Sequence, residues 1–216
     1  FQLLTRGRTS ADIKDSNVRT YNDLQIYLEE GAEVKAAVLN AENGPIYLGK
    51  NSQVQEGALV RGSFALGEDS FVNMGAKVRG DSSIGPCCKI GGEVSNSVLF
   101  GYSNKSHDGF IGNSVLGEWC NLGADTNTSN LKNNYLPVKV WHYGTESFYN
   151  SGLQFCGLVM GDHSKCGINT MFNTGTVIGV SANIFGSGFP RTFVPSFAWG
   201  GAHGYTTFRL GKAFET

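Results

Sequence analysis

The sequence has few charged side chains, and neither sign gathers into a block. Its 17 basic and 18 acidic residues give a formal net charge of -1, and no basic cluster is present that would release counterions from a nucleic acid. No apolar run is long enough to span a bilayer, and no stretch resembles a signal peptide. We therefore expect no nucleic-acid or membrane partner and a cytoplasmic location.

The five cysteines include no CxxC pair, and their number is odd. Both features argue against a disulfide framework and against a thiolate zinc site. We interpret them as small buried hydrophobic side chains. They are Cys87, Cys88, Cys120, Cys156 and Cys166.

Glycine, by contrast, is abundant at 30 residues, which is typical of a backbone that turns often and tightly. Between the glycines, an aliphatic residue recurs every six positions, and a second residue, small in most cases, follows four positions later. The aliphatic positions are Leu48, Val54, Val60, Leu66, Val72, Val78, Ile84 and Ile90. The residues four positions later are Ser52, Ala58, Phe64, Ser70, Ala76, Ser82, Cys88 and Val94.

A period of six fits neither a flat strand nor an α-helix. It predicts a short strand and a corner, three times per coil, in a three-sided parallel solenoid whose coils stack about 4.8 Å apart. Glycine follows the aliphatic residue at Gly49, Gly67 and Gly85, so one coil has eighteen residues. The aliphatic residue fills the interior, and the small residue fits beside a corner.

The pattern returns in the second half, after an interruption, at Met160, Cys166, Phe172, Ile178 and Ile184. We predict an N-terminal segment at 1–27, a β-helix at 28–190 with an excursion near 131–154, and a C-terminal cap at 191–216. The aromatic-rich cap could instead fold against a neighbouring subunit and close a coenzyme pocket. Because the chain begins at Phe1 and ends in the helix-like run LGKAFET, we expect it to be a piece of a longer protein.

Several residues near the interruption could carry chemistry. His107 has a side chain whose ordinary pKa, near 6.5, suits a general base, although a lone histidine is more often a surface or core residue. Arg61 and Arg79 are eighteen residues apart, so they stack on successive coils. Two like charges so close point to a phosphate site, and two side chains that splay into solvent are the equal alternative. Lys105 and Lys132 flank the same region and are candidates for substrate binding.

The stretch KSHDGFIGNSVLGEWCNLGADTNTSN resembles the acetyltransferase half of the bifunctional bacterial enzymes that make UDP-N-acetylglucosamine. Those enzymes belong to the hexapeptide-repeat acyltransferases, and the similarity covers about residues 28 to 190. The chain also resembles two-domain sugar nucleotidyltransferases of Bacteroidetes, whose N-terminal nucleotidyltransferase domain it lacks. The matching positions are His107, Ile111, Gly112, Leu116, Gly117, Asn121, Leu122, Gly123, Ala124, Thr126 and Asn130.

The resemblance implies an all-β fold, a single-stranded left-handed parallel β-helix with a short N-terminal segment and a C-terminal capping segment. It implies His107 as general base, Asn121 and Asn130 as ligands of the sugar phosphate and its amine, and Arg79 as a phosphate ligand. It also implies acetyl-CoA as co-substrate, with Ala124 and Gly186 beside it, no required metal, and a homotrimer.

We therefore expect an acetyl-CoA-dependent N-acetyltransferase acting on an amino-sugar 1-phosphate, within a bifunctional sugar-1-phosphate nucleotidyltransferase. A silent trimerisation and regulatory domain is the alternative, because Phe110 replaces a tyrosine of the family pattern and Ile168 replaces a serine associated with coenzyme A. A zinc hydratase of carbonic-anhydrase type is a third possibility. It is disfavoured because the four histidines show no pair about five residues apart: His107, His142, His163 and His203.

Overall fold

The computed structural model describes residues 2–213, in two compact units, Phe1–Tyr102 and Ser103–Thr216. Its regular structure is almost entirely short β-strands, with one helix near each end, α1 (Gln2–Thr5) and α2 (Leu210–Ala213). Phe1 and the last three residues of the LGKAFET run lie outside the described residues. Among the residues described, no helix has the length and apolar character to cross a membrane.

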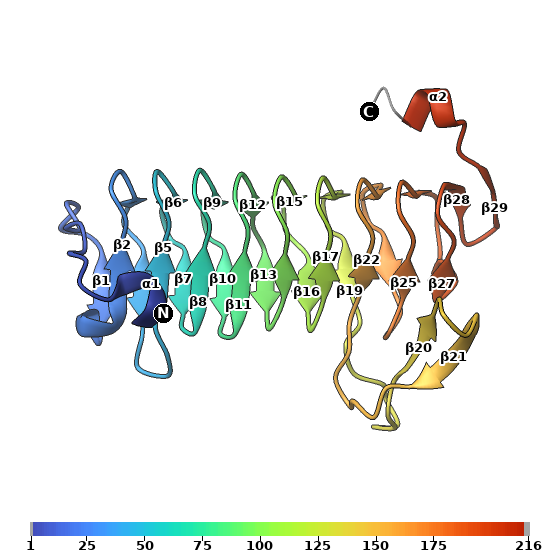
Figure 1. The fold of residues 1–216 in the computed structure, drawn as a ribbon, viewed down its shortest axis with the longest axis horizontal. Coiled ribbons are helices and arrows are strands. Elements are labelled where there is room, and N and C mark those ends of the chain that lie inside the picture. The colour runs from blue at the N-terminus through green and yellow to red at the C-terminus, as the bar shows by residue number, and fades with distance from the viewer. Residues whose placement is uncertain (1, 214–216) are drawn as a thin grey trace. The chain divides into compact units, whose positions relative to one another are not determined.

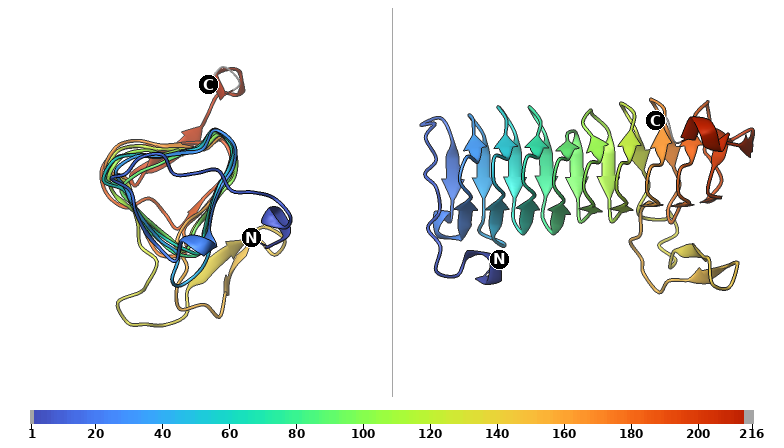
Figure 2. Two further views of the ribbon diagram at one scale, coloured as in Figure 1. Left: turned by 90° about the vertical axis from the view of Figure 1, so that its left-hand side faces the viewer. Right: turned by 45° about the horizontal axis from the view of Figure 1, so that its top comes forward.

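The first unit is a parallel solenoid with three faces, and in the end-on view of Figure 2 its blue-to-green coils outline a triangle. Strands at equivalent positions of successive coils form one parallel sheet each (Figure 1). The first sheet contains β1 (Arg19–Tyr21), β4 (Val38–Asn40), β7 (Leu59–Arg61), β10 (Lys77–Arg79) and β13 (Glu93–Ser95). The second contains β2 (Ile26–Leu28), β5 (Ile46–Leu48), β8 (Phe64–Leu66), β11 (Ser82–Ile84) and β14 (Val98–Leu99). The third contains β3 (Glu33–Val34), β6 (Gln53–Val54), β9 (Phe71–Val72) and β12 (Lys89–Ile90), and a single 3-10 turn, η1 (Asp23–Gln25), precedes β2.

The core of this unit consists of the aliphatic residues that recur every six positions. All eight, from Leu48 to Ile90, are buried, and the registers stack them on one another, as in Val54 beside Val72 and Val72 beside Ile90. The residues four positions later are buried as well. The predicted left-handed parallel β-helix is therefore confirmed, down to the residues that line its interior.

The small polar side chains of the pattern tie neighbouring coils together. Ser70 Oγ donates to the Gly85 carbonyl at 2.8 Å and accepts from the Cys88 N–H at 2.8 Å. One hydroxyl thus satisfies two backbone groups of the next coil at a corner where no strand hydrogen bond is available. This explains why serine suits a buried position that also has little room.

The second unit repeats the arrangement in its green-to-red coils (Figure 2). One face contains β17 (Val115–Leu116), β22 (Val159–Met160), β25 (Val177–Ile178) and β27 (Phe193–Val194). A second face contains β15 (Asn104–Lys105), β18 (Asn121–Leu122), β23 (Lys165–Cys166), β26 (Asn183–Ile184) and β28 (Ala198–Gly201). The third contains β16 (Phe110–Gly112), β19 (Asn127–Thr128) and β24 (Met171–Phe172), with β19 and β24 paired in parallel. Its predicted aliphatic positions, Met160, Cys166, Phe172, Ile178 and Ile184, are all buried.

An excursion leaves this unit between β19 and β22 and contains an antiparallel hairpin, β20 (Lys139–His142) with β21 (Ser147–Asn150) (Figure 1). Its base is closed by a hydrogen bond from the Cys156 N–H to the Asn130 carbonyl at 2.9 Å. Val138 and Val140 pack with Val177 of β25 in a buried cluster. The hairpin is therefore fixed to its own coil stack by apolar contacts.

The coil pairing continues past residue 190, because β27 and β28 pair in parallel with strands of the preceding coil. β29 (Gly204–Thr207) then folds back and pairs antiparallel with β28. Parallel stacking ends there, which is consistent with a capping function for the end of the chain. The exact domain limits stay a prediction.

Candidate functional site

One corner of the second unit brings three of the predicted site residues into a column. The registers place Asn104 beside Asn121, Asn121 beside Lys165, and Lys165 beside Asn183. Three residues after each, at the corner that follows, come His107, Ala124, Ile168 and Gly186. Since adjacent coils are about 4.8 Å apart, these four residues form a column parallel to the stack of coils.

Backbone hydrogen bonds hold this column in register. The Asp125 N–H donates to the Asp108 carbonyl at 3.0 Å, and the Asn169 N–H donates to the Ala124 carbonyl at 2.8 Å. Gly109 closes the His107 turn with a φ of 110°, which an L side chain rarely adopts. A Cβ at Gly109 would also collide with the Thr126 carbonyl oxygen of the next coil. The local sequence thus forces a tight turn that leaves His107 and Asp108 exposed.

Lys105, which the sequence predicts as a substrate ligand, lies in the interior of the coil and not on its surface. Its side chain is completely buried, and its ammonium donates hydrogen bonds to the carbonyls of His107 and, at 2.9 Å, Asp108. Burial lowers the pKa of Lys105 to about 8, while the nearby Asp108 and Asp125 carboxylates partly oppose that shift. The sequence contained the signal, because Lys105 lies six residues after Leu99 and six before Ile111, at an aliphatic position of the pattern.

Asn121 is exposed on the outer side of β18, the strand that ends just before the turn that contains Ala124. Asn130 lies at the next corner, beyond β19, where its amide donates to Asn113 Oδ1 at 2.7 Å. A side chain on Gly112 would meet both the Phe110 ring and, at 2.8 Å, Asn130 Nδ2. The Phe110 ring and the Asn130 amide therefore pack together over Gly112, at a different corner from His107.

Lys132 is held by a hydrogen bond within the excursion, whereas Gly186 lies at an open corner of the coils. The Lys132 ammonium donates to the Pro137 carbonyl at 3.1 Å, inside the excursion. Gly186 has a φ of 100° and open space around the position of a Cβ. Gly186 thus adds no side chain to the column at its corner.

Arg79 belongs to the first unit, where it is exposed and lies beside Arg61 in register, as predicted from their eighteen-residue separation. Its guanidinium is 3.5 Å from the Glu93 carboxylate. An exposed ion pair of this length contributes little to stability, so the guanidinium can exchange partners readily.

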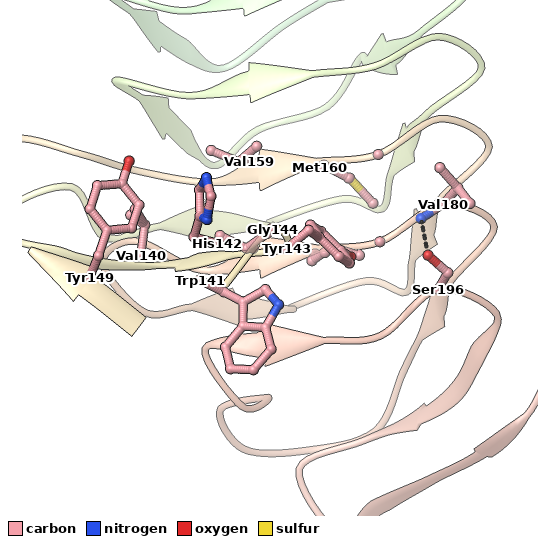
Figure 3. Close-up of a pocket in the computed structure, with 14 residues that line it drawn as sticks. Val140, Trp141, His142, Tyr143, Gly144, Tyr149, Val159, Met160, Val180 and Ser196 are labelled. Atoms are coloured by element: carbon pink, nitrogen blue, oxygen red, sulfur yellow. Dashed lines mark hydrogen bonds between the residues drawn. The ribbon is translucent and has the colours of Figure 1, made fainter. Parts of the chain in front are cut away.

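A cavity of about 510 Å³ lies on another face of the second unit, between the hairpin and strands β22 and β25. In Figure 3, Tyr149 and His142 line one end, and Val180 and Ser196 lie at the other. Its wall residue Trp141 stacks on Phe193 with ring centroids 4.1 Å apart. None of the predicted site residues lines this cavity.

The His, Cys, Asp and Glu side chains decide whether this unit could hold a metal ion. In the part of the chain that the structure describes, no three His, Cys, Asp or Glu side chains are grouped as ligands of an ion. His163 stacks on Trp119, and His142 contacts Thr145 and Tyr149.

Comparison with known proteins supports the resemblance. No family model matches the sequence. The chain is 34% identical over 87 residues to the bifunctional protein GlmU of Methanocaldococcus jannaschii, which covers 40% of this chain and 21% of that protein. It is 36% identical over 93 residues to a bifunctional sugar-1-phosphate nucleotidylyltransferase/acetyltransferase of Sulfurisphaera tokodaii, covering 43% of this chain and 23% of that protein. Among solved structures, the polySia specific acetyltransferase NeuO covers 92% of this chain and 85% of its own, with a TM-score of 0.45 and 14% identity.

The matched region therefore spans about a fifth of the length of these two curated relatives. Over about 40% of this chain, the similarity to bifunctional sugar-1-phosphate nucleotidyltransferase/acetyltransferases is confirmed.

Proposed function

We propose that the second unit transfers an acetyl group from acetyl-CoA to the amine of an amino-sugar 1-phosphate, with His107 as the general base. The observation that carries the proposal is the corner column, in which an exposed histidine, Ala124, Ile168 and the open Gly186 follow one another on successive coils. The bifunctional relatives, one of them named as an acetyltransferase, support the reaction class.

In the proposed reaction, the His107 imidazole takes a proton from the substrate ammonium, and the free amine attacks the thioester carbonyl. The new N–C bond forms as the C–S bond breaks. The ammonium nitrogen loses two protons in becoming an amide: one passes to the leaving thiolate, which yields coenzyme A, and the other is released from His107 to solvent. Direct transfer is favoured because the buried thiols are poor nucleophiles. Burial raises the pKa of Cys120 to about 11 and raises that of Cys166 as well.

The negative charge on the thioester oxygen requires a hydrogen-bond donor. In the turn from Gly123 to Asp125, the Gly123 N–H donates to the Cys166 carbonyl at 3.0 Å and the Asp125 N–H to the Asp108 carbonyl at 3.0 Å. Both are therefore committed to neighbouring coils. We assign the oxyanion contact to the N–H of Ala124, which lies in the same column as His107.

Within the second unit, substrate binding is proposed for Asn121, on the strand that precedes the Ala124 corner, and for Asn130 and Lys132, which lie away from the His107 corner. Arg79, in the first unit, is proposed by itself as a phosphate ligand. An exposed guanidinium beside a second arginine suits a sugar phosphate, and Asn121 and Asn130 offer amide groups to the sugar. We further propose a homotrimer, which a molar mass three times that of the chain would show, and action in the cytosol together with a nucleotidyltransferase domain.

A second candidate function is a trimerisation and regulatory scaffold for that nucleotidyltransferase. It is favoured by Phe110, whose ring packs over Gly112 and presents no hydroxyl. The two functions differ in whether acetyl-CoA is consumed.

The test is incubation of the purified chain with acetyl-CoA and a panel of amino-sugar 1-phosphates, with coenzyme A measured by chromatography. A thiol reagent is unsuitable because Cys87 is exposed. We expect release by the wild type, a loss of about 100-fold or more in His107→Ala, and unchanged release in His203→Ala, a matched exposed histidine in the β28–β29 turn. Release that survives in His107→Ala removes His107 from the mechanism, and no release with any sugar favours the scaffold.

A further inference from the structure

Lys105 occupies a position that the rest of the fold reserves for apolar side chains. Asn104 pairs with Asn121, so Lys105 lies beside Leu122, which in turn pairs with Cys166. Leu122 and Cys166 are buried, and Lys105 is completely so. An aliphatic side chain would fill this space without bringing a charge into the interior.

A buried ammonium is unfavourable unless its hydrogen bonds compensate for the lost water. Here the ammonium lies under the His107 turn and donates to the carbonyls of His107 and Asp108. The Asp108 carbonyl also accepts from the Asp125 N–H of the next coil. The lysine thus ties the backbone of the residue that carries the imidazole to the column of neighbouring corners.

The ionisable groups around the ammonium are the Asp108 and Asp125 carboxylates, which favour its charged form, and the Cys166 thiol, whose own pKa is raised by burial. Burial is the larger effect and lowers the pKa of Lys105 to about 8. The charge is therefore largely retained at neutral pH and lost at moderately alkaline pH. A neutral amine donates weaker hydrogen bonds, so at alkaline pH the hydrogen bonds to the His107 and Asp108 carbonyls weaken.

We infer that Lys105 is a positioning residue: its buried ammonium, bonded to the carbonyls of His107 and Asp108, holds the Ser106–Gly109 turn so that the imidazole faces the substrate. This inference rests on the proposed acetyl transfer and deepens it, because it gives the buried lysine a role in presenting the base. The rival explanation is that Lys105 merely fills the core.

The test compares the wild type with Lys105→Met, whose unbranched apolar side chain fits a core position, and with the control Lys89→Met. Lys89 lies on β12, where it is exposed over Phe71. We expect Lys105→Met to keep or raise the melting temperature, to lose about tenfold or more in kcat, and to change KM little. We expect Lys89→Met to match the wild type in all three.

Two further readouts distinguish positioning from filling. In the wild type, kcat should fall as the pH rises through about 8, and this limb should be absent in Lys105→Met. Independently of any activity, amide hydrogen exchange of Asp108 and Gly109, followed by NMR, should be at least tenfold faster in Lys105→Met, corrected for intrinsic rates. Unchanged kcat with unchanged exchange in a folded Lys105→Met overturns the inference.

The exchange measurement also separates this inference from the proposed function. If the wild type acetylates no sugar, the proposed function fails on its own. Fast exchange in Lys105→Met would then still show that the lysine holds the turn, and unchanged exchange would show that it does not.

Discussion

Gly123→Ala is the substitution for which the structure gives the clearest expected cost. Gly123 follows β18 at the site corner, and a Cβ there would lie 2.5 Å from the Gly167 carbonyl carbon and 2.5 Å from the Ile168 nitrogen. Both are backbone atoms of the next coil, so neither can rotate away. Relieving the overlap requires a backbone shift of about 1 Å, and overpacking of this kind costs about 1–3 kcal/mol.

The next coil supplies a matched control. Leu122 pairs with Cys166, so Gly167 occupies the position equivalent to Gly123. A Cβ at Gly167 would lie 3.6 Å from Phe185 Cβ and 3.8 Å from both the Ile184 carbonyl oxygen and Phe185 Cα, which are ordinary contacts. Alanine there should be neutral or stabilise the protein by up to about 1 kcal/mol, because it reduces the freedom of the unfolded chain.

Urea unfolding monitored by circular dichroism measures both variants against the wild type. We expect Gly123→Ala to lose about 2 kcal/mol of unfolding free energy and Gly167→Ala to lose none. Equal losses in the two variants would refute the reasoning, because the distance to the following coil would then not decide the cost of a side chain at this corner.

Two other predictions follow from the buried ionisable groups. Iodoacetamide at pH 8 should alkylate the exposed Cys87 in the native protein. Cys120, whose pKa is raised to about 11, and Cys166 should react only after unfolding. Peptide mass spectrometry measures the labelling, and early labelling of Cys120 would contradict its burial. The pKa of Lys105 is lower in the folded than in the unfolded protein, so the unfolded protein binds more protons between about pH 8 and 10.5. Over that window the stability of the wild type should rise by at most ~3 kcal/mol relative to Lys105→Met, measured by urea unfolding at each pH; a constant difference would place the ammonium in contact with water.

Most of the fold could be predicted from the sequence, because the core residues recur at a fixed spacing of six. Every sixth residue from Leu48 to Ile90 is buried, as its spacing requires. The register of Arg61 beside Arg79 followed from the same count. The period failed as a guide at Lys105, because a lysine at an aliphatic position contradicts the expectation that charges stay outside a narrow core.

The hairpin of the excursion was not predicted, although the sequence held a cue. Gly144 lies between two stretches rich in aromatic residues, Val140–Tyr143 and Phe148–Tyr149, which is typical of two paired strands with a turn between them. The contact of Trp141 with Phe193 joins residues far apart in the chain, and no local pattern could reveal it. The placement of Asn130 at a different corner from His107 likewise depends on the path of the coil.

The strand registers of the first unit have a consequence for how such a chain can change in length. Val38 pairs with Leu59, Leu59 with Lys77, and Lys77 with Glu93, so the separation along the chain is 21, 18 and 16 residues while the strands stay aligned. Corners absorb insertions and deletions, whereas a single residue lost within a strand would turn its inward side chains outward. Protein engineers can therefore graft peptides or binding loops at corners of this scaffold, and evolution could lengthen one corner at a time without rebuilding the rest.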